Sequence, residues 1–162
     1  MTQSTLQNRY EIESFDLGYQ FVTETGIIYF ITFIEYPTIS DFLSTKIYMF
    51  NIEHTTPKEH IHYKYDNRVR NTVIFILETF FSNHEDALIT IYDFSDGRQL
   101  CRKRLFDSWF KLFNNGKLCK LEAKCLIDEQ LTYTSLLYNK KHYDDKYLKE
   151  EFQELIDANF YN

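Results

Sequence analysis

The segment Ala87–Phe94 (ALITIYDF) constrains the fold more than any other part of this chain. It is almost continuously apolar, which is typical of a strand that is covered on both faces of a sheet. Helical patterns stand on both sides of it, at Asn67–Ser82 and Arg98–Phe113. A strand between two helices indicates crossover connections, which place the N-termini of the helices at the carboxyl ends of the strands.

The remaining segments predict a sheet that is extended at both ends. Thr25-Gly26 suits a tight hairpin turn, and Asp128-Glu129 lies at the centre of a second hairpin. The predicted strands outside the middle are Tyr19–Thr23, Ile27–Tyr36, Lys46–Glu53, Lys117–Ile127 and Gln130–Asn139, and Asp144–Asn159 is a terminal acidic helix.

These elements predict an α+β fold with a single mixed β-sheet in the order β-β-β-α-β-α-β-β-α. No repeat or linker divides the chain, so residues 1–162 are expected to form one domain. Its parts are a polar N-terminal segment at 1–18, a β-meander at 19–53, a βαβαβ-like core with its hairpin at 67–139, and the terminal helix at 144–159.

Composition excludes several classes of protein. The 29 aromatic residues (15 Phe, 13 Tyr and 1 Trp) and the scarcity of glycine and proline, 4 and 2, are incompatible with a disordered chain, a collagen or a proline-rich ligand. With 4 glycines, the chain contains no Walker loop, G-x-G-x-x-G or G-x-S-x-G motif. The net charge of −6 makes nonspecific nucleic-acid binding unlikely for the molecule as a whole. Residues 67–127 are nevertheless mildly basic, with 10 Lys and Arg against 7 Asp and Glu.

The N-terminus has no apolar signal core, and no apolar run is long enough to span a membrane. Three cysteines without a C-x-x-C pair indicate a reduced, cytoplasmic protein. Neither a cofactor nor a metal site is predicted. His60-x-His62 fits a polar edge strand better than a metal site, since no third ligand has a suitable spacing. An Asp93-x-x-Asp96 cation site is disfavoured because arginines follow it closely.

The second helix of the middle region has an unusual distribution of charge. On a helical wheel of about 100° per residue, Arg98 and Arg102 fall within a broad apolar arc. Arg104, Asp107, Ser108 and Lys111 lie on the opposite, solvent side. The apolar arc consists of Cys101, Leu105, Phe106, Trp109, Phe110, Leu112 and Phe113. Cys101 is therefore expected to be a buried, inert thiol, although pairing with a histidine as a nucleophile is an alternative.

Arg70 falls on the apolar side of the first helix, so that three arginines are expected to point inward near helix N-termini. Such cations oppose the helix dipole and need an anionic partner when buried. One hypothesis is an internal ion-pair network with Asp93 or Asp96, or with Glu78. The other is a bound phosphate or carboxylate at the sheet edge. The candidate site residues are therefore Arg70, Arg98, Arg102, Asp93 and Asp96.

The block Ser95–Trp109 (SDGRQLCRKRLFDSW) resembles the signature of a family of small bacterial proteins of unknown function. The hairpin segment Tyr19–Thr23 followed by Gly26-Ile27 resembles the start of the same proteins. The resemblance covers most of the chain, from about residue 19 to 113, and implies no activity.

The order of elements also resembles the core of the GCN5-related acetyltransferases. This resemblance would make residues 66–82 the pyrophosphate loop and its helix. The loop of that family is rich in glycine, whereas Asp66–Asn71 (DNRVRN) contains none. The tyrosine that often acts as general acid in the next helix has no counterpart in Arg98–Phe113.

The leading functional hypothesis is a noncatalytic domain that binds a protein partner or a small anionic ligand. The alternative is an acyl-CoA-dependent enzyme with a degenerate phosphate loop. Nucleic-acid binding through the basic middle region is a weaker third hypothesis.

Overall fold

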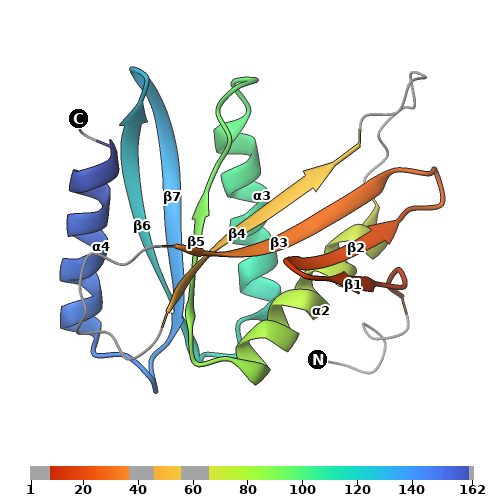
Figure 1. Cartoon of the computed structure of the whole chain (residues 1–162), viewed down its shortest axis with the longest axis horizontal. Coiled ribbons are helices and arrows are strands. Elements are labelled where there is room, and N and C mark those ends of the chain that lie inside the picture. The colour runs from red at the N-terminus through yellow and green to blue at the C-terminus, as the bar shows by residue number, and fades with distance from the viewer. Residues whose placement is uncertain (1–7, 37–45, 56–65, 161–162) are drawn as a thin grey trace. The chain divides into compact units, whose positions relative to one another are not determined.

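A computed structural model describes residues 8–36, 46–55 and 66–160 (Figure 1). These residues form helices and a single mixed sheet of seven strands in the order β1-β2-β3-β4-β5-β7-β6, which confirms the predicted α+β class. The strands are β1 (Glu13–Phe15), β2 (Gly18–Val22), β3 (Ile28–Tyr36), β4 (Ile47–His54), β5 (Ala87–Ile91), β6 (Leu118–Ile127) and β7 (Gln130–Asn139). The helices are α2 (Asn67–Asn83), α3 (Gln99–Phe113) and α4 (Asp145–Phe160).

The described elements follow the predicted order, with one strand more. The additional strand is β1, which lies in the predicted polar N-terminal segment 1–18 and pairs with β2. It has three exposed residues, so no alternation of apolar and polar side chains marks it.

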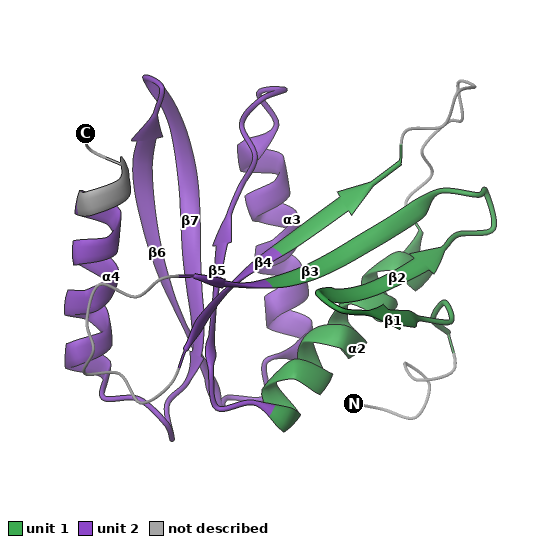
Figure 2. Cartoon of the chain, in the orientation of Figure 1, with its two compact units in different colours: residues 1–33, 51–83 green, residues 34–50, 84–162 purple. Residues whose placement is uncertain are grey.

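The chain divides into two compact units (Figure 2). One unit consists of residues 1–33 and 51–83, and the other of residues 34–50 and 84–162. That residues 1–162 form a single domain stays a prediction.

The first unit contains the β2–β3 hairpin and α2. The predicted turn at Thr25-Gly26 is present, with Gly26 at a φ of 80°, and Val22 pairs with Ile28 next to it. Gly18 is required by close packing, since a Cβ there would lie 1.9 Å from the carbonyl oxygen of Ile31. Helix α2 buries Val73, Ile76, Leu77 and Phe80, which share one helical face, and Val69 is half-buried.

In the second unit, β5 lies between β4 and β7. It is parallel to β4, with Ile47 opposite Ala87, and antiparallel to β7. Because β6 is also antiparallel to β7, strands β4, β5 and β6 share one direction and β7 is inserted between the last two. Asp128 and Glu129 form the β6–β7 turn with φ of 48° and 63°, the left-handed conformation that two-residue hairpins favour.

Strand β5 is covered on both faces, as its apolar sequence predicts. Ala87 and Ile89 belong to a core cluster with Leu148, Phe152 and other residues of α4. Successive strand residues point to opposite faces, and Tyr92, beyond the end of β5, packs against Phe106 of α3 with ring centroids 6.2 Å apart. The strand ends at Ile91 rather than Phe94, because the chain turns at Asp93.

Candidate functional site

The connection from β5 to α3 is a tight turn held by two aspartates. The Asp93 carboxylate accepts hydrogen bonds from the backbone N–H and the hydroxyl of Ser95, at 3.0 and 2.9 Å. Asp96 Oδ1 accepts one from the backbone N–H of Arg98 at 3.0 Å. Gly97 has a φ of 71°, which L-residues with a side chain rarely adopt. Aspartate and glycine therefore shape this turn.

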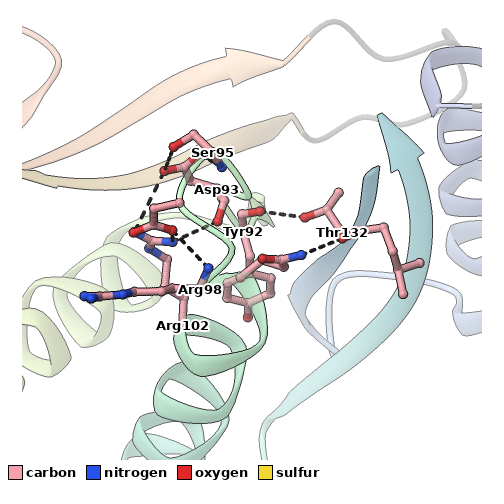
Figure 3. A network of polar contacts seen from close by, with 9 residues as sticks. Tyr92, Asp93, Ser95, Arg98, Arg102 and Thr132 are labelled. Atoms are coloured by element: carbon pink, nitrogen blue, oxygen red, sulfur yellow. Dashed lines mark hydrogen bonds and ion pairs between the residues drawn. The ribbon is translucent and has the colours of Figure 1, made fainter. Parts of the chain in front are cut away.

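The guanidinium of Arg102 closes the turn from the first turns of α3 (Figure 3). Its Nη1 and Nη2 donate to Asp96 Oδ1 and Oδ2 at 2.7 and 2.8 Å, and Nη1 also donates to the carbonyl of Asp93 at 2.9 Å. The Arg102 guanidinium holds the pKa of Asp96 well below its usual range, and Asp96 raises the pKa of Arg102. We call these three residues the Arg102 corner; its cation is neutralised within the chain.

The chain on both sides of the corner is also connected to the neighbouring strand β7. Thr132 donates its hydroxyl to the carbonyl of Tyr92 at 2.6 Å (Figure 3). Gln99 Nε2 donates to the carbonyl of Leu131 at 2.8 Å. Strand, turn and helix are thus joined by hydrogen bonds, which restricts the orientation of the first turn of α3.

Arg98 does not point inward, and the prediction that it does is wrong. Its side chain is exposed, and the described residues provide no carboxylate partner for its guanidinium. Cys101 is exposed as well, so the expected buried thiol is also wrong.

Arg98 is the N-cap residue that precedes α3, so the helical wheel does not describe it. For Cys101 the reason is the orientation of α3 about its own axis. Its buried residues are Phe106, Trp109 and Phe113, whereas Leu105 and Leu112, assigned to the same apolar arc, are 40% and 62% exposed. The buried face therefore runs from Trp109 to Phe106. Arg102 lies on the same side of the wheel but in the first turn of α3, at the end of the helix, and is half-buried.

Arg70 lies in the other unit, on α2. Its Nε and Nη2 are each 3.2 Å from Asn71 Oδ1. Arg70 forms no ion pair with Glu78, one of the internal partners considered from the sequence, although the structure describes both residues. The structure brings together Arg102, Asp93 and Asp96; convergence of Arg70 with them stays a prediction.

The N-terminus of α2 is capped by a carboxylate. Asp66 Oδ1 accepts the backbone N–H of Arg68 at 2.8 Å, and Oδ2 accepts the hydroxyl of Tyr10 at 2.5 Å. Burial and this hydrogen bond raise the pKa of Tyr10. The Arg68 guanidinium stacks 4.0 Å from the Tyr10 ring centroid and pairs with Glu24. The position of the predicted pyrophosphate loop therefore already contains negative charge.

A second ionic cluster, which the sequence reasoning missed, joins α3 to β6. Lys103 Nζ lies 2.7 Å from both Asp107 Oδ2 and Glu122 Oε1, and Lys120 pairs with the same two carboxylates. Burial lowers the pKa of Lys103, but the hydrogen bonds to Asp107 and Glu122 outweigh burial and raise it. We call these four residues the Lys103 cluster. The i,i+4 spacing of Lys103 and Asp107 was its only local signal.

The part of the chain that the structure describes contains no group of three or more His, Cys, Asp or Glu side chains arranged to hold a metal ion. His60 and His62 lie outside the described residues. None of the described helices combines the length and the apolar character that crossing a membrane requires.

The comparisons with known proteins give one match. The model of a family of unknown function, DUF6169, matches residues 65–154, more than half of the chain. No curated protein and no solved structure matches. The expected membership of an uncharacterised family is confirmed, while the Tyr19–Thr23 hairpin lies outside the matched range.

Proposed function

Since the chain belongs to the family of unknown function DUF6169, we propose its function from its own geometry: it is a noncatalytic domain that binds another protein. The observation that carries this proposal is that carboxylates of the chain itself occupy the positions where an anionic ligand was expected.

Two helix N-termini illustrate this, each within its own unit. At α2, Asp66 accepts the free N–H of Arg68. At α3 no described side chain caps the first turn, but Asp96 lies beside it, where it accepts the N–H of Arg98 and two hydrogen bonds from Arg102. A phosphate at a helix N-terminus would need the N–H groups of the first turn. An incoming anion would have to displace Asp66 at α2 or approach the Asp96 carboxylate at α3, which disfavours tight binding of a small anion at either helix.

An acyl-CoA enzyme remains the second candidate. Strands β4 and β5, which precede and follow α2 in the sequence, are parallel, and this agrees with the order of elements in the GCN5-related acetyltransferases. The segment Asp66–Asn71 argues against this candidate. It contains no glycine, and the Asp66 carboxylate already accepts an N–H at the start of the helix. For nucleic acid, much of the basic middle is neutralised, since Arg102, Lys103 and Lys120 are paired with carboxylates.

Titration calorimetry with acetyl-CoA and coenzyme A at about millimolar concentration tests whether the chain is an acyl-CoA enzyme. We expect no saturable heat of binding for either ligand. We also expect sulfate and ATP to leave the melting temperature of the wild type unchanged, since a ligand that binds only the folded state would raise it. The matched variants are Asp66→Asn and Asp96→Asn, which remove the negative charge but keep the shape. Saturable acetyl-CoA binding by the wild type would overturn the proposal.

Protein binding itself is tested with the immobilised full chain in an extract of its own cells, followed by surface plasmon resonance with each enriched protein in purified form. We expect at least one protein to bind directly and saturably. If no enriched protein binds in purified form, the domain has no stable protein partner and the proposal fails.

A further inference from the structure

One side of α3 exposes apolar side chains in a regular row. Cys101, Leu105, Ser108 and Leu112 follow one another at spacings of i, i+4, i+7 and i+11, so they form a stripe along the helix. All four are exposed, Leu105 and Leu112 by 40% and 62%. We call these four residues the α3 stripe.

The unpaired charges that α3 and its N-cap residue place beside the α3 stripe all have the same sign. Arg98, Arg104 and Lys111 are exposed and form no ion pair with any other described residue. Asp107 is the single acidic residue of α3, and it is turned toward β6, where Lys103 and Lys120 bind it. The surface around the stripe is therefore locally basic and apolar, although the chain as a whole carries a net charge of −6.

We propose that the α3 stripe binds an acidic amphipathic helix of a partner protein, with aliphatic side chains of that helix packed between Leu105 and Leu112. This inference rests on the proposed function and specifies its partner. A helical occupant fits because two helices pack through rows of residues spaced three and four apart. An acidic occupant fits because Arg98, Arg104 and Lys111 are the charges that flank the row.

The same observations disfavour two other occupants. A nucleic acid would leave Leu105 and Leu112 in water, and the net charge of −6 repels phosphates. A second copy of the chain could offer its acidic helix α4. However, α3 and α4 cover opposite faces of β5, so a contact of α3 with α4 cannot close as a two-fold dimer. Repeated from copy to copy, it would build open chains unless the rotation closes a ring.

The test measures binding of fluorescein-labelled helical peptides to the full chain by anisotropy. One peptide of about six turns carries leucine at heptad spacing with glutamate elsewhere. A second replaces glutamate with lysine, and a third replaces leucine with serine. We expect the Glu/Leu peptide to bind on the order of tenfold or more tighter than either control, and its affinity to fall as salt rises.

Variants of the chain connect this binding to the α3 stripe. Leu105→Ser with Leu112→Ser, and separately Arg104→Glu with Lys111→Glu, should each weaken the Glu/Leu peptide at least about tenfold, a typical cost when central contacts are lost. The matched controls are Leu126→Ser with Leu131→Ser, exposed leucines of the β6–β7 hairpin, and Lys140→Glu with Lys141→Glu. Both controls should bind the peptide like the wild type.

Several results would overturn the inference. These are equal binding of the Lys/Leu peptide, an unchanged affinity in the Leu105 and Leu112 variant, or no binding of the Glu/Leu peptide. Binding of a single-stranded oligonucleotide that only the charge variant abolishes would assign the surface to nucleic acid. Sedimentation that shows self-association lost in both stripe variants would assign it to a second copy. If the wild type binds neither the Glu/Leu peptide nor acetyl-CoA, the stripe proposal fails and the proposed function stays intact.

Discussion

Helix α3 takes part in two ionic clusters that are built from similar residues in different environments. In the Arg102 corner, the side chains of Arg102 and Asp96 are 39% and 43% exposed. In the Lys103 cluster, the side chains of Lys103 and Lys120 are 16% and 14% exposed. The corner shapes a turn at the end of a strand, whereas the cluster holds the middle of the helix against β6.

Because of this difference in exposure, the cluster with the better hydrogen-bond geometry is not the one expected to contribute more to the free energy of unfolding. The Arg102–Asp96 pair has two parallel hydrogen bonds, the better geometry, but water and salt screen both charges. The lysines of the Lys103 cluster are largely removed from water, so loss of a carboxylate there leaves charge that water cannot easily solvate. We therefore expect the cluster to contribute more to stability than the corner.

The largest expected effect comes from Asp107→Ala, which leaves Lys103 and Lys120 with Glu122 as their remaining carboxylate. We expect the free energy of unfolding to fall by about 2 kcal/mol, the typical cost of removing a charged hydrogen-bond partner from a half-buried group. Urea denaturation followed by circular dichroism measures it. Arg104→Ala, an exposed position on the same helix, is the control and should stay within about 0.5 kcal/mol of the wild type. Equal losses in both variants would contradict the comparison.

A smaller effect is expected for Arg102→Ala. The substitution removes the paired hydrogen bonds to Asp96 and the bond to the carbonyl of Asp93. Because the guanidinium is partly exposed, the loss should be about 0.5–1 kcal/mol in the same urea experiment. Arg102→Lys keeps the charge without the bidentate geometry and should recover part of it. A loss as large as that of Asp107→Ala would show that exposure does not separate the two clusters.

Acid sensitivity sharpens the comparison further. The Arg102 hydrogen bonds lower the pKa of Asp96. Burial raises the pKa of Asp107, but the hydrogen bonds from Lys103 and Lys120 outweigh burial and lower it. A carboxylate with a lowered pKa stabilises the fold above its unfolded pKa of about 4, and this stability is lost as the pH falls through the folded pKa. The stability that Asp96 and Asp107 contribute should therefore decline as the pH falls below about 4.

The salt dependence of these acid effects should differ between Asp96 and Asp107, because exposed charges are screened more than buried ones. In urea titrations at about pH 3 and pH 6, Asp96→Asn should flatten the acid dependence at low salt and hardly change it at about 0.5 M salt. Asp107→Asn should flatten it under both conditions. The reverse order of salt sensitivity would contradict the assignment of the corner as the more exposed cluster.

The smallest effect is expected for Arg98→Ala. Its guanidinium is exposed and has no carboxylate partner among the described residues. The melting temperature should change by less than about 2 °C. Differential scanning calorimetry checks this, with Arg102→Ala as the comparison. A marked drop would mean that Arg98 belongs to an internal network after all.

Most of the secondary structure followed from local signals in the sequence. Strand β5 was recognisable from its apolar run, and the β6–β7 hairpin from Asp128-Glu129, because turns and buried strands depend on neighbouring residues. Asp66 caps α2 by accepting the N–H of Arg68, a role that aspartate commonly takes at a helix start. Strand β1 was missed, since three exposed residues carry no periodic pattern.

The orientation of α3 about its axis was decided only in the tertiary structure. By itself, the sequence determined that Arg98–Phe113 is a helix with apolar residues over a broad arc. Which part of that arc is buried depended on partners that are distant in sequence: Phe106 meets Tyr92, and Lys103 with Asp107 meets Glu122 and Lys120. Those contacts turn Leu105 and Leu112 toward water and Arg102 toward Asp96. A helical wheel contains no such long-range information, because it gives the angular positions of side chains about the helix axis and not the residues that they contact.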